Sequence, residues 1–352
     1  MKNKVFIVFL ALTLVALPLF SACAAPAPPA AIELGLALIW PATHDVATKQ
    51  FPDYIKMVEE AAKGKYTIKL NLFPPGTLLG GAEIYDGVTK GVCDMGSSCF
   101  AYTPGRFPFM EAVELPAVVY NTAQVAAPVV WEFYKKFKPA EVSGLKLLYL
   151  FSTGPGWLLT KSPVRTLDDL QGLEIRATGL SAKSLEALGA VPVAMPQSEV
   201  YPSLQKGIVK GNLAPLEVLK GFKQAEITDY VTTTPFLYNT AFFMIMNLDK
   251  WNSLPKDLQD AFDKVADDAN KAGGQLWTDI QKDGMDFAVE TTGQQMIYLS
   301  DEEMAKWIAI LKPIQDKYVA DMAAKGLPGK EALDFVLKES TKYNKEYPLL
   351  KY

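Results

Sequence analysis

Histidine, arginine and cysteine are all scarce in this chain of 352 residues. The single histidine, His44, excludes a histidine metal cluster and a second histidine proton shuttle. Arginine occurs only at Arg106, Arg165 and Arg176, and the formal net charge is −4. A protein that binds nucleic acid usually carries a basic patch that displaces counterions from the phosphates. We therefore expect no nucleic-acid partner and no metal site.

Catalytic motifs are missing as well. The sequence Gly154-Pro155-Gly156 begins like a dinucleotide-binding loop, but Leu159 stands where the third glycine belongs. The chain has no Gly-x-x-x-x-Gly-Lys, no His-Glu-x-x-His and no Gly-x-Ser-x-Gly sequence. A serine–histidine–aspartate triad would depend on His44, and nothing positions a serine for it. We therefore expect neither an enzyme nor a cofactor.

Residues 1–22 have the features of a secretory signal peptide. Lys2 and Lys4 precede an apolar run over 5–20, which is too short for a typical membrane span. The sequence Leu19-Phe20-Ser21-Ala22-Cys23 is similar to a bacterial lipobox, with Phe20 in place of the usual aliphatic residue. This predicts an extracytoplasmic (periplasmic) protein anchored by a lipid on Cys23. The alternative is ordinary cleavage nearby, with Cys23 lost or free.

The next segment, 23–32, is rich in alanine and proline and predicts an extended tether. Two cysteines remain beyond it, Cys93 and Cys99. An oxidising compartment permits a disulfide between them. The alternative is a pair of small buried residues beside a strand.

The body of the chain alternates apolar strands with amphipathic helices, which predicts an α/β fold. Strands are expected at 33–39, 66–72, 92–96, 145–151, 173–177, 191–194 and 241–247. Helices are expected at 51–62, 81–90, 122–137, 181–188, 199–206, 218–225, 255–291, 301–323 and 329–343. The helix over 255–291 would be about 55 Å long, enough to run along two domains, and Gly273-Gly274 could bend it.

A block of motifs in residues 163–217 points to a known family. It contains Pro163-Val164, Asp168-Asp169-Leu170-Gln171-Gly172-Leu173-Glu174-Ile175-Arg176, Leu188-Gly189-Ala190-Val191-Pro192-Val193-Ala194-Met195, and Glu199-Val200-Tyr201-Pro202-Ser203-Leu204-Gln205-Lys206-Gly207. In order and spacing it resembles the solute-binding proteins of tripartite ATP-independent periplasmic (TRAP) transporters, of the dicarboxylate-binding (DctP) type. Segments 73–81, 91–94, 114–116 and 254–262 agree with this resemblance, which covers nearly all of the chain after residue 22.

The resemblance implies a two-lobed clamp that closes over its ligand, with a long helix spanning both lobes. Lobe I would comprise 30–153 and 242–281, and lobe II would comprise 154–241 and 282–352 with the C-terminal helices. The implied function is to capture a small organic acid and deliver it to a membrane permease without ATP. The alternatives are a ligand sensor subunit or an extracytoplasmic enzyme on the same clamp.

Arg176 is the main candidate for binding the ligand. It ends the apolar strand at Leu173–Ala177, and in the family the arginine of this motif binds the ligand carboxylate. The planar guanidinium matches a carboxylate through two parallel hydrogen bonds. The alternative is a structural ion pair with an acid of the protein.

Two departures from the family pattern narrow the ligand class. The segment Thr153-Gly154-Pro155-Gly156-Trp157-Leu158 lacks the second arginine found in many relatives, and Ala214 replaces the usual asparagine contact. A dicarboxylate or a sugar acid needs such polar partners, because an unpaired buried polar group costs about 1–3 kcal/mol. We therefore expect an aromatic or apolar monocarboxylate.

The remaining candidate site residues are of two kinds. The aromatic candidates for cavity walls, each equally compatible with a core position, are Trp40, Phe100, Trp157 and Phe236. The polar candidates are His44 in the loop after the first strand, Ser97 and Ser98 at a strand end, and Glu217 beyond Pro215.

Overall fold

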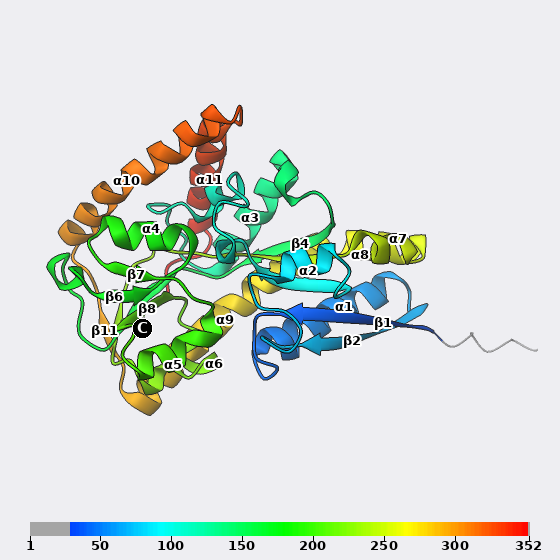
Figure 1. Ribbon diagram of the computed structural model, residues 1–352, viewed down its shortest axis with the longest axis horizontal. Coiled ribbons are helices and arrows are strands. Elements are labelled where there is room, and N and C mark those ends of the chain that lie inside the picture. Colours follow the sequence, from blue (N-terminus) through cyan, green and yellow to red (C-terminus); the bar gives the residue numbers. More distant parts are fainter. Residues whose placement is uncertain (1–28, 351–352) are drawn as a thin grey trace, which may run out of the picture.

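The computed structural model describes residues 29–350, which form two α/β lobes, each built on one β-sheet (Figure 1). The first sheet has the order β2-β1-β3-β10-β4, with β1 (Ala30–Leu38), β2 (Tyr66–Phe73), β3 (Met95–Cys99), β10 (Ala241–Met246) and β4 (Lys146–Ser152). The second sheet has the order β11-β9-β5-β8-β6-β7, with β11 (Gln295–Ile297), β9 (Tyr230–Thr232), β5 (Trp157–Thr160), β8 (Gly211–Ala214), β6 (Glu174–Arg176) and β7 (Val191–Val193). The predicted α/β fold class is confirmed.

The composition of each strand in the first sheet follows its position. β10 is buried along its whole length because it pairs antiparallel with β3 on one side and β4 on the other. A strand inside a covered sheet needs apolar residues on both faces, and its sequence is Ala-Phe-Phe-Met-Ile-Met. β2 lies at the edge, and there the exposed Thr67 and Lys69 flank the buried Ile68. A continuous apolar run thus marks the interior strand β10, and alternation of apolar and polar residues marks the edge strand β2.

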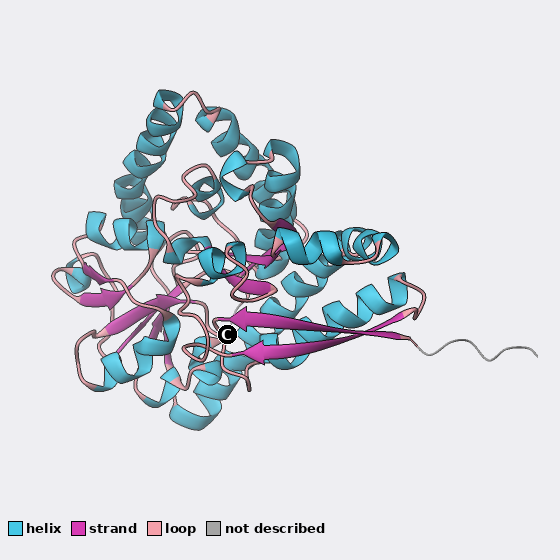
Figure 2. Ribbon diagram, turned by 45° about the vertical axis from the view of Figure 1, so that its right-hand side comes forward, coloured by secondary structure: helices cyan, strands magenta, loops and turns pink. Residues whose placement is uncertain are grey.

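Helices surround the two sheets (Figure 2). They are α1 (Phe51–Ala61), α2 (Ile84–Thr89), α3 (Ala123–Phe137), α4 (Gly179–Ala187), α5 (Val200–Gln205), α6 (Val218–Gly221), α7 (Leu248–Ser253), α8 (Lys256–Lys264), α9 (Ala266–Thr292), α10 (Asp301–Ala324) and α11 (Gly329–Asn344). No helix within residues 29–350 has both the length and the apolar content needed to cross a bilayer.

Helix α9 connects the two lobes. It has 27 residues, about 40 Å at the usual helical rise. It packs against α3 and β4 of the first lobe and against α6 of the second. The expected helix over 255–291 is interrupted, however, because Val265 (φ −91°, ψ 0°) leaves helical geometry and separates α8 from α9.

Gly273 and Gly274 do not end or interrupt α9, which runs through both residues. Instead they permit close packing. A Cβ atom on Gly274 would lie 3.1 Å from the Ala123 carbonyl oxygen in α3, and a Cβ on Gly273 would lie 3.3 Å from Phe151 in β4. The glycine pair therefore sets how closely the helix approaches the first lobe.

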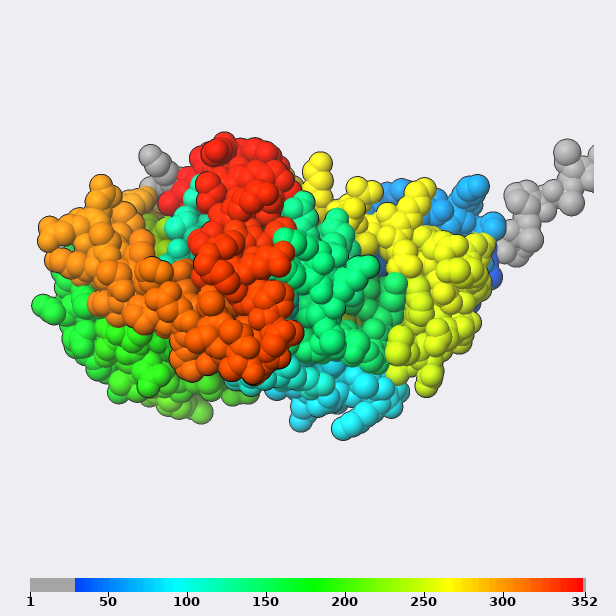
Figure 3. Space-filling view, turned by 90° about the horizontal axis from the view of Figure 1, so that it is seen from above, coloured from blue at the N-terminus to red at the C-terminus, as the bar shows by residue number. Residues whose placement is uncertain are grey.

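The two C-terminal helices also contact both lobes. α10 packs against α4 of the second lobe, and α11 packs against α3 of the first. Figure 3 shows α10 (orange) and α11 (red) side by side over one face of the molecule.

Several elements differ from the sequence-based expectation. β1 begins at Ala30 and so includes three residues assigned to the tether. β3 begins three residues later than expected, because Gly91 (φ +75°) turns the chain and Val92 is half exposed. α6 ends at Gly221 instead of near residue 225. Four short strands, β5, β8, β9 and β11, were not expected.

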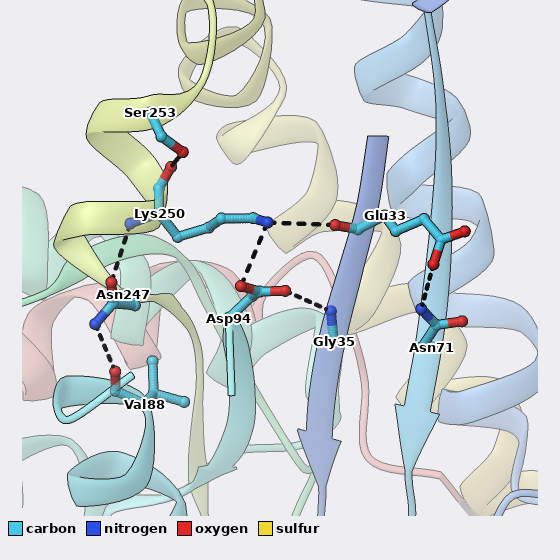
Figure 4. A network of polar contacts seen from close by, with 8 residues as sticks. All are labelled: Glu33, Gly35, Asn71, Val88, Asp94, Asn247, Lys250 and Ser253. Atoms are coloured by element: carbon cyan, nitrogen blue, oxygen red, sulfur yellow. Dashed lines mark hydrogen bonds and ion pairs between the residues drawn. The ribbon is translucent and has the colours of Figure 1, made fainter. Parts of the chain in front are cut away.

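A polar network fixes α7 to the first sheet on the side of β1 (Figure 4). Asp94 accepts a 2.8 Å hydrogen bond from the backbone N–H of Gly35 and lies 3.4 Å from Lys250 Nζ. Lys250 also donates to the Glu33 carbonyl at 3.4 Å, and Asn247 caps α7 by accepting from the Lys250 N–H. These contacts are partly exposed, so they orient the helix and add little stability.

Candidate functional site

The candidate site is a narrow cavity of about 30 Å³ between the lobes. The first lobe contributes residues at or just after strand ends, including Trp40 after β1 and Cys99 at the end of β3. The second lobe contributes Arg176 at the end of β6 and Glu217 after β8. Carboxyl ends of strands are the usual place for ligands in α/β folds.

Arg176 is 2% exposed and is held in place by neutral acceptors. Its Nε donates to the Met195 carbonyl at 3.0 Å, and its Nη1 donates to Gln197 Oε1 at 3.1 Å and to Asn212 Oδ1 at 3.4 Å. No aspartate or glutamate within residues 29–350 forms an ion pair with this guanidinium. A buried cation without a counterion is costly, which favours binding of an anion.

Two donors of the cavity wall lack a partner among the described residues. Gln197 Oε1 accepts from Arg176 and from Asn212 Nδ2, so its amide orientation is fixed and Nε2 is left unpaired. The indole Nε1 of Trp277, on α9, is also buried and unpaired. Such groups are rare in proteins because they lose their hydrogen bonds to water. They suit a ligand that carries acceptors.

The rest of the wall is mainly aromatic. Phe242 lies at the centre of the aromatic cluster, stacked on Trp277 with centroids 5.1 Å apart and edge-on to Trp40 at 5.0 Å. The six large aromatic side chains that line the cavity are Trp40, Tyr102, Phe222, Tyr238, Phe242 and Trp277. They offer an apolar surface next to the guanidinium.

The cavity has one cation and one anion. Burial raises the pKa of Tyr102 to about 12 and also raises the pKa of Tyr238 and Cys99, so these groups are neutral at physiological pH. Glu217 is 4% exposed, and its Oε2 lies 3.0 Å from His44 Nε2. Arg176 and Glu217 are the charged side chains among the lining residues.

Two larger hollows, of about 520 and 630 Å³, lie on the outer surface. One lies over α3 and α9, and its Lys135 is paired with Asp267. The other lies under α10. Neither is lined by a buried arginine, and the two residues with unpaired donors, Gln197 and Trp277, line the narrow cavity instead. We therefore place the candidate site between the lobes.

Comparison with known proteins identifies the family. The model of the bacterial extracellular solute-binding proteins, family 7 (DctP), matches residues 37–321. The chain belongs to this family and is a TRAP solute-binding protein. The family consists of transport proteins and not of enzymes, as predicted from the missing motifs.

Solved TRAP solute-binding proteins share the two-lobed fold. One from Desulfovibrio salexigens is 34% identical, with a TM-score of 0.78 over 91% of this chain and 98% of its own. One from Rhodoferax ferrireducens, solved with copurified benzoate, is 25% identical, with a TM-score of 0.83 over 90% and 99%. The 2,3-diketo-L-gulonate-binding periplasmic protein of Escherichia coli is 27% identical over 80% of this chain and 84% of its own.

Of the predicted site residues, this TRAP protein brings Arg176, Trp40 and Glu217 to the cavity wall. His44 lies directly behind the wall, bonded to Glu217. The two serines bond within the first lobe, Ser97 to the Phe243 carbonyl and Ser98 to the Gly81 carbonyl.

The three other aromatic candidates belong to hydrophobic clusters. Phe100 packs against Phe107 and Phe243, Phe236 lies edge-on to Trp307, and Trp157 is buried beside β8 and α9. None of them is a lining residue of the cavity. These three side chains therefore occupy core positions, the alternative stated for them from the sequence.

No pattern in the sequence indicated Gln197, Tyr102 or Trp277 as cavity residues. Gln197 lies in the loop after β7, where a neutral amide gives no charge signal. Tyr102 lies in the 3₁₀ turn Phe100–Tyr102 directly after β3. Because β3 was expected to end at residue 96 and ends at Cys99, this turn was not placed at the strand end. Trp277 lies on the buried side of α9. Residues that face the core and residues that face a cavity recur at the same helical spacing, so the sequence pattern does not separate them.

Both remaining cysteines, Cys93 and Cys99, are buried free thiols, so the disulfide alternative is wrong. In the described part of the chain, no three His, Cys, Asp or Glu side chains group closely enough to hold a metal ion. The predicted signal peptide and Cys23, the predicted site of lipidation, lie outside the described residues.

Proposed function

We propose that this TRAP solute-binding protein captures a small aromatic or apolar monocarboxylate and holds it with Arg176. The observation that carries the proposal is the buried guanidinium in the cavity, held by the neutral acceptors Met195, Gln197 and Asn212. Such an arrangement keeps the cation available for a ligand carboxylate. Charge-assisted hydrogen bonds of this kind are among the stronger interactions in binding sites.

The aromatic wall supports the ligand class. Trp40, Phe242 and Trp277 provide flat apolar surfaces against which a ring packs favourably. Relatives support it too, since solved TRAP proteins that are 25–28% identical are complexed with benzoate, mandelate or metahydroxyphenylacetate. Other relatives are named for different ligands, such as ectoine and 2,3-diketo-L-gulonate, so the proposal for this chain rests on the residues of its own cavity.

The proposed cycle is a hinge closure of two lobes, 30–153 with 242–281 and 154–241 with 282–352. The cavity is too narrow for a ligand to enter without separation of the lobes. A ligand favours the closed form only if it contacts both lobes. Arg176 on one side and Trp40 on the other provide such contacts. The loaded protein would then dock on the TRAP permease, near the membrane through lipid on Cys23.

The proposal is tested by mass spectrometry of ligand released from purified protein, followed by calorimetry with the acids found and with benzoate, mandelate and succinate. We expect aromatic acids to bind and succinate to bind weakly or not at all. Arg176→Ala should weaken binding at least about thirtyfold, because the ligand carboxylate loses its buried partner. Arg165→Ala, at an exposed position of the same lobe, is the matched control and should bind normally. Tight succinate binding, or unchanged affinity in Arg176→Ala, would refute the proposal.

A further inference from the structure

We propose that Glu217 selects the ligand by charge: it rejects a second carboxylate and accepts a hydrogen bond from a neutral donor at the far end of a monocarboxylate. This inference rests on the proposed function, in which Arg176 holds the first carboxylate. It deepens that function by defining the ligand class as a monocarboxylate with a neutral donor group.

The charge balance of the cavity disfavours a second carboxylate. Arg176 and Glu217 are its charged side chains, and they do not form an ion pair with each other. One ligand carboxylate would balance Arg176. A second carboxylate would add an anion to a cavity that already contains the anion of Glu217 and has no second cation.

The hydrogen bonds of His44 show that it does not neutralise Glu217. The backbone N–H of Val46 donates to His44 Nδ1 at 3.2 Å, so this nitrogen is an acceptor and carries no proton. The proton of the neutral ring is then on Nε2, which donates to Glu217 Oε2 at 3.0 Å. The pair therefore has the single negative charge of the carboxylate.

Glu217 is also fixed in position. A Cβ on Gly284 of α9 would lie 2.3 Å from the Leu216 carbonyl oxygen and 3.0 Å from the Glu217 Cα, so the helix backbone presses directly on this segment. A Cβ on Gly221 would lie 2.8 Å from the His44 ring and 3.0 Å from Glu217 Oε2. With its backbone held by α9 and its carboxylate packed against Gly221 and His44, Glu217 has little room to swing away from an incoming anion.

The apolar surroundings strengthen the effect of the Glu217 charge on a ligand. The centroid of the His44 ring lies 5.6 Å from that of Phe222 and 6.3 Å from that of Trp277, and Glu217 is 4% exposed. Water and ions screen little at such a buried position, so repulsion between two carboxylates is stronger than at the surface. An amide or hydroxyl donor gains a charge-assisted hydrogen bond in the same place.

The test uses two probes of nearly equal shape, isophthalate and 3-carbamoylbenzoate, with benzoate as reference. At neutral pH the first has two carboxylates, whereas the second has one carboxylate and one neutral amide. We expect the wild-type protein to bind 3-carbamoylbenzoate at least about tenfold more tightly than isophthalate. Glu217→Gln, which keeps an acceptor for His44, should reduce this ratio to about twofold or less. Glu186→Gln, at an exposed position on α4, makes the same change in net charge and should leave the ratio unchanged.

The outcomes are distinguishable. Equal affinity of the wild-type protein for the two probes, or an unchanged ratio in Glu217→Gln, overturns the selection role while benzoate binding still supports the proposed function. Binding of benzoate but of neither probe shows that size sets the limit, and this also overturns the inference. Binding of none of the three acids refutes the proposed function, and the inference with it. The wild-type comparison is decisive even if Glu217→Gln does not fold.

Discussion

The hydroxyl of Tyr102 accepts a 2.9 Å hydrogen bond from the backbone N–H of Gln197, and this bond joins the two lobes at the cavity. Tyr102 follows β3 of the first sheet, and Gln197 follows β7 of the second. Both residues line the cavity, and Gln197 also accepts from Arg176. Contact between the lobes is thus coupled directly to the position of the guanidinium.

Tyr102→Phe should weaken ligand binding without a large change in stability. The variant loses the hydroxyl that accepts from Gln197 and also contacts the Arg176 side chain across the lobes. This loss disfavours the closed form by about 1 kcal/mol. Because ligand binds between the lobes, we expect the Kd to rise about fivefold. Calorimetry with the copurified acid measures this change.

The matched control is Tyr201→Phe, since the Tyr201 hydroxyl bonds to Glu226 at the surface of the second lobe. It should bind as the wild type does. An unchanged Kd in Tyr102→Phe would show that the bond across the lobes does not contribute to closure.

Trp277→Phe should weaken ligand binding more clearly than it lowers the stability of the ligand-free protein. The indole N–H has no partner in the described protein, so its removal breaks no hydrogen bond of the ligand-free form. We expect the free energy of unfolding without ligand to fall only through lost packing, by about 1 kcal/mol. The affinity for an acid that accepts from this N–H should fall about fivefold.

Trp131→Phe is the control, because Trp131 donates to Asp267 in the outer hollow away from the cavity. Its affinity should equal that of the wild type. If Trp277→Phe binds as tightly as the wild type, Trp277 is only part of the wall.

The sequence predicted those parts of the fold whose signal is local and long. The continuous apolar run of β10, the alternation in β2 and the stripe of α9 each extend over enough residues to show their period. β5, β8, β9 and β11 have only three or four residues each, and their pairing depends on distant partners. No local period exists in segments so short.

The residues of the cavity wall divide in the same way. The place of Arg176 at the cavity wall was predictable because a rare charged residue ends an apolar strand within a recognisable motif. Ser97 and Ser98 were expected at a strand end, but β3 begins three residues later, so both lie inside the strand and bond to the Phe243 and Gly81 carbonyls. Spacing shows which side of an element is buried, but not whether that side meets the core or a cavity.

Glu114→Gln should change how stability depends on pH. Burial raises the pKa of Glu114 to about 8, and its Oε1 accepts from the Ala241 N–H at 2.8 Å. An unfolded glutamate titrates near about 4.3, so between these values the folded protein holds more protons and stability falls as pH rises. Glutamine keeps the acceptor and has no charge to bury.

We therefore expect Glu114→Gln to be close to the wild type at about pH 4 and to exceed its unfolding free energy by more than about 1 kcal/mol at about pH 8. Urea unfolding at several pH values measures the difference, with Glu186→Gln as the exposed control. Parallel pH profiles for Glu114→Gln and the wild type would contradict a neutral Glu114 in the folded protein.

Two glycines of α9, Gly273 and Gly284, allow a matched comparison of how tightly this helix packs against its neighbours. A Cβ on Gly284 would meet the Leu216 carbonyl oxygen at 2.3 Å, a backbone atom that cannot rotate away, whereas a Cβ on Gly273 would meet Gln50 and Phe151 at 3.3 Å. In both variants alanine gains about 1 kcal/mol of helix propensity. Gly273→Ala should therefore be close to neutral. Gly284→Ala should lose about 1–3 kcal/mol on balance and also weaken ligand binding, because the helix must shift away from the segment that carries Glu217. Urea unfolding and calorimetry on both variants test this contrast, and equal stability of the two would show that the close approach at Gly284 relaxes without cost.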